Sequence, residues 1–357
     1  MVDGARRAAA FDSIEAALAS GAYVGAVLAT DDPSLVCDLP RLSLDVDTGP
    51  YHFGRRLAGV VRRHSLERVV YIGAGSLPLL GAEDLAAVAA ALASRPCVVT
   101  NNPYSSDLVA FTAVPEVTSV IEQVDSDNAL ARALTERTGL PLETLPRTVT
   151  TLLDIDGPTD LAVLALTGGS GPRLRVHRDA LALDLERYRA VLPLFTDRRA
   201  QIVVAGRVGS HAWRYLERET ACRVRLFAEE RGMQADGRAQ EGVARSLLGF
   251  YLEAAGVDRF FETLAQLGDA AIIDTRVLLA HARRDACRAD RFLSDLGCWQ
   301  EIGDGFLRDF TRGAVSAAIP VLLGGHSLVS GGLMALNELA WQEQETDAGT
   351  QPPSARL

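Results

Sequence analysis

The feature that most constrains the fold is an alternation of short apolar runs with amphipathic segments through the first 170 residues. Runs such as YVGAVLAT (23–30), RVVYIGAG (68–75) and CVVTNN (97–102) have the length and composition of buried strands. Between them, GRRLAGVVRRHS (54–65) and GAEDLAAVAAALAS (81–94) have helical periodicity. Strands that alternate with helices predict an α/β layer fold with a largely parallel sheet.

A glycine-rich stretch, TGGSGPRLR (167–175), predicts a linker between two domains. Beyond it, QIVVAG (201–206), SHAWRYLERET (210–220) and CRVRLFAEE (222–230) predict one strand–helix–strand unit, and the remaining chain is expected to be mainly helical. The tail is polar and contains proline, which is typical of disorder. We therefore expect an α/β domain over 1–170, a mixed α/β, mainly helical domain over 171–341, and a disordered tail over 342–357.

Composition limits the partners and the location. The formal net charge is −10, which argues against a nucleic-acid backbone or an anionic membrane as partner. No run approaches the roughly 20 apolar residues of a membrane span, and no signal peptide is recognisable, so we expect a cytoplasmic protein. The five cysteines form no CxxC pair. All 36 basic residues are arginine, so phosphate contacts must come from arginine, backbone N–H groups or metal.

Three motifs in the first half occur in an order found in one enzyme family. They are VVYIGAGSLPLL (69–80), NNPYSSDLVAF (101–111) and LLDIDGPTDLAVL (152–164). The pattern resembles the GT-A-fold nucleotidyltransferases, in particular MobA-like and 2-phospholactate guanylyltransferases. The resemblance implies a three-layer GT-A or Rossmann-like first domain, and it covers about the first 170 residues.

The resemblance implies nucleotidyl transfer from an NTP to a small phosphorylated or acidic acceptor. Asp154, Asp156 and Asp107 would then be catalytic, with Asp154 and Asp156 holding Mg²⁺ and with Gly73 and Ser76 beside the substrate. Two parts of the family pattern differ here. Ser76 occupies the position of a metal-binding aspartate, and no glycine-rich triphosphate loop follows the first strand.

These carboxylates also have structural interpretations. Asp154 and Asp156 precede a helix that starts at Pro158, where an aspartate commonly caps the first turn. Asp107 could be a solvated carboxylate at the edge of a strand. Both interpretations stay open at the level of sequence.

Two stretches of the second half place polar residues at strand ends. Arg207, Gly209 and Ser210 lie between a predicted strand and a predicted helix, where backbone N–H groups and an arginine can bind an anion. Another strand ends in the residues Glu229, Glu230 and Arg231, which predict either part of a ligand site or a solvated turn with a local ion pair.

The stretch AAIIDTRVLLAHARRD (270–285) interrupts an apolar run with Asp274 and Arg276. If this stretch is one helix, Asp274 and His281 share a face and could bind metal or form an acid–base pair. The alternative is a buried Asp–Arg pair between two helices.

The stretch AAIPVLLGGHSLVSGGLMAL (317–336) has two double glycines around His326 and Ser327. Glycine allows close backbone approach, either to a ligand at His326 or to another helix at a subunit interface of a homo-oligomer. No strand–turn–helix context is recognisable that would make Ser327 a nucleophile.

Three hypotheses follow. The first is a nucleotidyltransferase with a diverged nucleotide loop. The second is an enzyme of another class, with an Arg/Glu/Asp/His site in the second half. The third is a non-catalytic relative that acts in binding or assembly. The first two predict a nucleotide or another phosphorylated small molecule as ligand.

Overall fold

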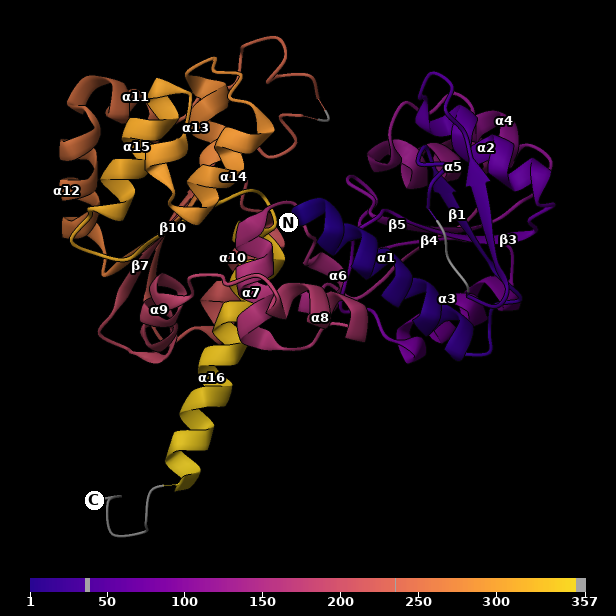
Figure 1. Cartoon of the computed structure of the whole chain (residues 1–357), viewed down its shortest axis with the longest axis horizontal. Coiled ribbons are helices and arrows are strands. Elements are labelled where there is room, and N and C mark those ends of the chain that lie inside the picture. Colours follow the sequence, from indigo (N-terminus) through magenta and orange to yellow (C-terminus); the bar gives the residue numbers. More distant parts are fainter. Residues whose placement is uncertain (36–38, 235, 351–357) are drawn as a thin grey trace. The chain divides into compact units, whose positions relative to one another are not determined.

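The chain forms two compact units, and residues 1–35, 39–234 and 236–350 are described by the structure, a computed structural model (Figure 1). The amino-terminal unit contains Arg6–Thr151 and Ser170–Leu174. The carboxy-terminal unit contains Met1–Ala5, Leu152–Gly169 and the chain from Arg175 onward. The sequence placed the domain division near residue 170, whereas residues 152–169 group with the carboxy-terminal unit.

The strands of the amino-terminal unit are short. They are β1 (Ala26–Thr30), β2 (Leu42–Val46), β3 (Arg68–Ile72), β4 (Val98–Thr100), β5 (Leu108–Thr112) and β6 (Leu142–Thr144). The main sheet has the order β3-β5-β4-β6, while β1 and β2 form a separate parallel pair. Strand β5 runs antiparallel to both of its neighbours, and only β4 and β6 pair in parallel. The expectation of a largely parallel sheet is therefore wrong for this unit.

Helices cover both faces of this mixed sheet. They are α1 (Val2–Ala19), α2 (Phe53–Arg63), α3 (Ala82–Ser94), α4 (Val117–Ile121), η1 (Asp127–Ala129), α5 (Leu130–Thr138) and α6 (Val149–Leu152). On β5, Val109 and Phe111 pack with α2, α4 and α5, while Leu108 and Ala110 pack with α3. Successive side chains of a strand point to opposite faces, so a strand buried on both faces is a continuous apolar run.

The carboxy-terminal unit contains a second, all-parallel sheet. Its strands are β7 (Gln201–Gly206), β8 (Arg223–Ala228), β9 (Ala270–Asp274) and β10 (Val321–Gly324), in the order β10-β9-β7-β8. The strand–helix–strand prediction for 201–230 is confirmed. The expectation of a mainly helical remainder is wrong at β9 and β10, because these two apolar runs extend the sheet.

The helices from residue 158 onward include those that flank this sheet on both sides. They are α7 (Pro158–Thr167), α8 (Pro172–Asp179), α9 (Glu186–Thr196), α10 (Ser210–Glu219), α11 (Leu247–Ala255), α12 (Val257–Leu267), α13 (Thr275–His281), α14 (Arg288–Leu296), η2 (Trp299–Glu301), α15 (Gly305–Val315), η3 (Leu328–Gly332) and α16 (Leu333–Thr350). Helices α11, α12 and α15 pack with Val203, Ala205 and Ile273 on one face of the sheet. Figure 1 shows α9, α10 and α16 on the opposite side of this sheet.

The last described helix, α16, continues to Thr350. The expected disorder is therefore wrong for 342–350, and residues 351–357 lie outside the described residues. None of the helices in the described part of the chain is long and apolar enough to cross a membrane.

Candidate functional site

The parallel sheet of the carboxy-terminal unit has a topological switch point between β7 and β9. Strand β8 follows β7 on one side, whereas β9 lies on the other side of β7. The connections that leave β7 and β9 at their carboxyl ends therefore diverge, and this is where open α/β sheets bind ligands. Gly206 ends β7 and Asp274 ends β9, so the residues that follow each of them line this edge.

Arg207 and Asp274 form an ion pair at this edge. Arg207 Nε donates to Asp274 Oδ2 at 2.6 Å, and Nη2 donates to Oδ1 at 3.1 Å. Asp274 also caps α13, because its side chain accepts from the Arg276 backbone N–H at 3.1 Å. Burial alone raises the pKa of Asp274, but the charges of Arg207 and Arg276 outweigh it and hold the pKa below its usual range. The carboxylate is therefore ionised and fixed in orientation.

Gly206 makes this pairing possible. Its φ is +127°, in a region of backbone conformation that residues other than glycine avoid. A Cβ at this position would overlap the Asp274 side chain. The absence of a side chain lets the end of β7 approach Asp274 closely.

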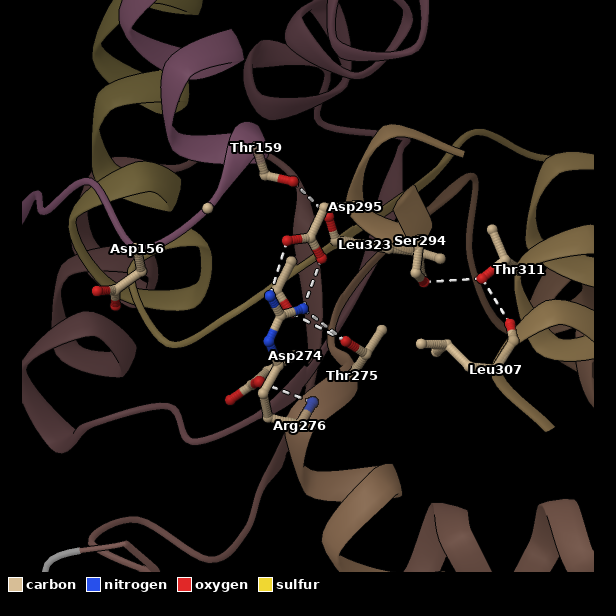
Figure 2. A network of polar contacts seen from close by, with 12 residues as sticks. Asp156, Thr159, Asp274, Thr275, Arg276, Ser294, Asp295, Leu307, Thr311 and Leu323 are labelled. Atoms are coloured by element: carbon tan, nitrogen blue, oxygen red, sulfur yellow. Dashed lines mark hydrogen bonds and ion pairs between the residues drawn. The ribbon is translucent and has the colours of Figure 1, made fainter. Parts of the chain in front are cut away.

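A second ion pair lies deeper, between Arg276 and Asp295 of α14. The guanidinium donates to both carboxylate oxygens, at 2.5 and 2.7 Å, and to the Gly324 carbonyl at 3.0 Å (Figure 2). The Asp295 side chain is fully buried. The pair joins α13, α14 and β10, which supports the structural alternative given for Arg276. Asp295 was not predicted from the sequence, because α14 also carries Asp290 and two arginines and nothing local marks Asp295 as the buried carboxylate.

His326 follows β10 at the same edge. Its Nδ1 is buried and has no hydrogen-bond partner among the residues that the structure describes. Burial lowers the pKa of His326, and the charge of Arg207 lowers it further, so the imidazole is neutral at pH 7. The negative charges of Asp274 and Asp156 act on this imidazole in the opposite direction, which places both carboxylates in its surroundings.

Ser327 lies in a strand–turn–helix context that the sequence did not reveal, because β10 and η3 flank it. Its Oγ donates to the Asp154 carbonyl at 2.9 Å and accepts from the Asp154 N–H at 3.1 Å. Ser327 is buried and engaged with backbone, so it acts as a structural bridge. Gly331 belongs to the same turn, and a Cβ there would overlap the Leu152–Leu153 backbone. The close approach expected of these glycines occurs within the chain.

The DIDGPTDL segment (154–161) therefore belongs to this edge. The capping role that was considered for Asp154 and Asp156 is performed by Asp160, whose Oδ2 accepts from the N–H groups of Asp156 and Gly157 at 2.8 and 2.7 Å. Burial raises the pKa of Asp160 to about 8, and the charge of Asp156 acts in the same direction. In Figure 2 the Asp156 carboxylate points away from the Arg276–Asp295 pair.

The loop after β7 forms the amino-terminal end of α10. Gly209 is the N-cap and has no side chain that could cap the start of α10. The exposed Arg231, which follows β8, lies beside Gly209: its Nε is 3.7 Å from the position that a Gly209 Cβ would take. Arg207 and Ser210 belong to the same loop and helix start. Two arginines and a helix amino terminus thus converge where an anion can bind.

The two glutamates before Arg231 are engaged in local structure. Glu229 accepts from Ser246 Oγ and from the Leu247 N–H, both at 2.6 Å, at the start of α11. Glu230 pairs with Arg238 through two hydrogen bonds of 2.9 Å. This is the arrangement of a turn with a local ion pair, and it leaves Arg231 as the residue of the three that faces the loop after β7.

His281 lies apart from Asp274. The proposal of one helical face for both is wrong, because Asp274 ends a strand and His281 ends the following helix. His281 Nδ1 accepts from the Ser246 N–H at 3.0 Å, and its Nε2 lies 3.3 Å from Glu253 Oε1. Its ring packs edge-on against Phe250. Both ring nitrogens of His281 thus have a polar partner, and the residue is a structural histidine of the core.

The remaining predicted residues lie in the amino-terminal unit. Gly73 follows β3 and its N–H donates to the Asp107 carbonyl at 3.1 Å, while Ser76 N–H donates to the Gly73 carbonyl at 3.0 Å. The Asp107 carboxylate accepts from the Asn101 side chain at 3.0 Å. Gly73, Ser76 and Asp107 therefore share one edge of the mixed sheet.

Within the described residues, no group of three His, Cys, Asp or Glu side chains is placed to hold a metal ion. Asp154 and Asp156 could bind Mg²⁺ only together with ligand phosphates, which is a common arrangement for this ion. Comparison with protein-family models and with curated protein sequences gives no match for this chain.

Proposed function

We propose that this protein is an enzyme that binds a phosphorylated small molecule or nucleotide at the carboxyl edge of the parallel sheet. The observation that carries the proposal is the convergence of Arg207, Arg231 and the uncapped start of α10 at the topological switch point. The chain has no lysine, so these guanidiniums and N–H groups are the chemistry it offers to a phosphate.

His326 supplies the acid–base chemistry in this proposal. The Nδ1 atom of this neutral imidazole has no hydrogen-bond partner among the described residues, so it is the ring nitrogen that accepts a proton in this proposal. Asp274 holds the Arg207 guanidinium in place and adds a nearby negative charge that stabilises the imidazolium once it forms.

Nucleotidyl transfer is the second candidate, and one observation favours it. The DIDGPTDL segment, which carries the resemblance to GT-A nucleotidyltransferases, meets this same edge through the bridge between Asp154 and Ser327. In this version Asp154 and Asp156 hold Mg²⁺ on the nucleotide phosphates.

Thermal shift tests the phosphate site, because a ligand that binds the native state raises the melting temperature. Pyrophosphate and each NTP are tested at millimolar concentration with and without Mg²⁺. We expect a shift that Arg231→Ala removes, with a loss in affinity of about tenfold or more. Arg214→Ala, on the exposed face of α10, is the matched control and keeps the shift.

The same assay separates the two candidates. A shift that requires Mg²⁺ and is lost in Asp154→Asn supports nucleotidyl transfer. A shift independent of Mg²⁺ that Asp154→Asn retains supports the His326 site. No shift with any of these ligands contradicts both candidates and favours the non-catalytic binding role.

A further inference from the structure

Strand β8 forms an open edge of the parallel sheet. It pairs with β7 on one side, and it has no strand partner on the other among the described residues. The Arg223 N–H donates to the Ala200 carbonyl next to β7. Because backbone groups alternate in direction along a strand, those of Val224, Leu226 and Ala228 point outward. Three residues thus present backbone donors and acceptors in the geometry that another strand requires.

A cavity of about 200 Å³ lies next to this edge. Its walls come from one face of α10, through Trp213, Leu216, Glu217 and Thr220, and from Cys222 and Val224 at the start of β8. Trp213, Leu216 and Glu217 of α10 and its C-cap Thr220 are spaced i, i+3, i+4 and i+7, so the three helical residues lie on one face. The cavity is smaller than the pockets that take whole cofactors or drug-sized ligands, and it suits one amino-acid side chain.

The lining has the chemistry of a site for a cationic side chain. Trp213 is 51% exposed and offers its ring, and the exposed Glu217 offers a carboxylate one helical turn away. An aromatic face attracts a cation, and the partly exposed Val224 can cover the apolar stem of a long side chain. A lysine or arginine meets both requirements.

We propose that the β8 edge and this cavity form a docking groove for an extended peptide segment of a partner protein. The segment adds to β8 as a new strand, and one of its lysine or arginine side chains enters the cavity between Trp213 and Glu217. Main-chain hydrogen bonds to Val224 and Leu226 supply affinity, and the cavity supplies specificity.

The β8 strand of a second copy of this chain does not fit the groove. In an antiparallel pairing of two β8 strands, the side chains on the cavity face would be Val224, Leu226 and Ala228, and none of them is cationic. On the other face, Arg223 and Arg225 of the two copies would approach each other, and like charges on neighbouring strands are unfavourable. Pairing between two copies of β8 is therefore unfavourable, and the chemistry of the cavity points to a basic segment of another protein.

Selection from a random heptapeptide phage library, with full-length protein as target, tests the proposal. Val224→Pro serves as counter-target, because proline removes an outward N–H and leaves the bonds to β7 intact. We expect enriched peptides that carry lysine or arginine and bind Val224→Pro roughly tenfold more weakly. Val224→Thr keeps the N–H and should bind like the original protein.

Synthetic versions of the enriched peptide then test the cavity by fluorescence anisotropy. Glu217→Gln should weaken binding about threefold to fivefold, and Trp213→Leu by a similar factor. Exchanging the peptide's cationic residue for norleucine should cause a comparable loss. These surface variants keep the test decisive if Val224→Pro does not fold.

Three outcomes overturn the proposal. They are a failure of any peptide to be enriched over the counter-target, enrichment of peptides without a cation, and a dimer in sedimentation experiments that Val224→Pro abolishes. The last of these would make a second copy the occupant.

Discussion

The two buried carboxylates at the sheet edge respond differently to burial. Asp274 is close to two arginines, Arg207 and Arg276, and their charges more than offset desolvation. Burial raises the pKa of Asp295, and the negative charge of Asp274 raises it further. Together these effects outweigh the pairing with Arg276. Asp274 therefore keeps its charge at neutral pH and holds Arg207 at the proposed phosphate site.

Gly206 should tolerate no side chain. In Gly206→Ala the Cβ overlaps Asp274 and the backbone stays at a φ of +127°, so we expect a loss of about 3 kcal/mol or more in unfolding free energy. Gly168 is the matched control in the same unit. Its φ is +76° and no atom lies within 4 Å of an added Cβ, so Gly168→Ala should cost about 1 kcal/mol. Urea denaturation compares the two, and equal losses would contradict the overlap argument.

Asp160 should give stability an unusual pH dependence. Burial raises its pKa to about 8 from an unfolded value of 3.8, so between these pH values the folded state binds more protons than the unfolded state. Its contribution to stability is therefore present at low pH and falls as pH rises through this window. Between pH 5 and pH 8, the unfolding free energy of Asp160→Asn should rise by more than about 1.4 kcal/mol relative to that of the original protein.

Urea denaturation at several pH values measures this difference. Asp258→Asn is the control, because Asp258 is an exposed carboxylate in the first turn of α12 and its replacement should not reproduce the slope. A constant difference between Asp160→Asn and the original protein would show that Asp160 is ionised in the folded state.

At the scale of elements, periodicity identified some strands and concealed others. QIVVAG is predicted as a strand because a glycine loop and an amphipathic helix follow it, and the segment forms β7. AAIID gives no such signal, since a fully buried run of four apolar residues has no period that separates strand from helix. The signal in that stretch is Asp274 before Thr275, an N-cap that divides strand β9 from helix α13.

Hydrogen exchange should show two classes of amide along β8. The N–H groups of Arg223 and Arg225 point toward β7 and should exchange slowly, while those of Val224 and Leu226 point outward and should exchange at least about tenfold faster. Amides of β9, a central and fully buried strand, should be among the slowest. NMR-detected exchange on the full chain measures this. Equal protection of all four β8 amides would mean that the edge is covered.

At the scale of the whole molecule, the sequence predicted several site residues without showing which of them meet. Arg207, Asp274 and His326 were each singled out, but 67 residues separate the first two. Bringing them together depends on the strand order β10-β9-β7-β8, which no local pattern encodes. The motifs of the first half suggested one site from Ser76 to Asp156, yet residues 152–169 pack with the parallel sheet.

This packing predicts where the chain can be divided. Thr159 Oγ1 donates to the Leu323 carbonyl at 2.6 Å, and Leu161, Val163 and Leu164 of α7 are completely buried. A fragment that starts at residue 171 loses α7 and exposes the surface that α7 covers. A fragment that starts at residue 152 keeps α7 and should melt cooperatively.

Circular dichroism and thermal unfolding of the two fragments measure the difference. We expect a sharp transition for the fragment from 152, and a broad transition at least about 10 °C lower for the fragment from 171, because several buried aliphatic side chains lose their contacts. Adding the shorter fragment to a synthetic peptide of residues 152–169 should restore part of the stability by mass action. Equal melting of both fragments would show that α7 is dispensable and would return the boundary to residue 170.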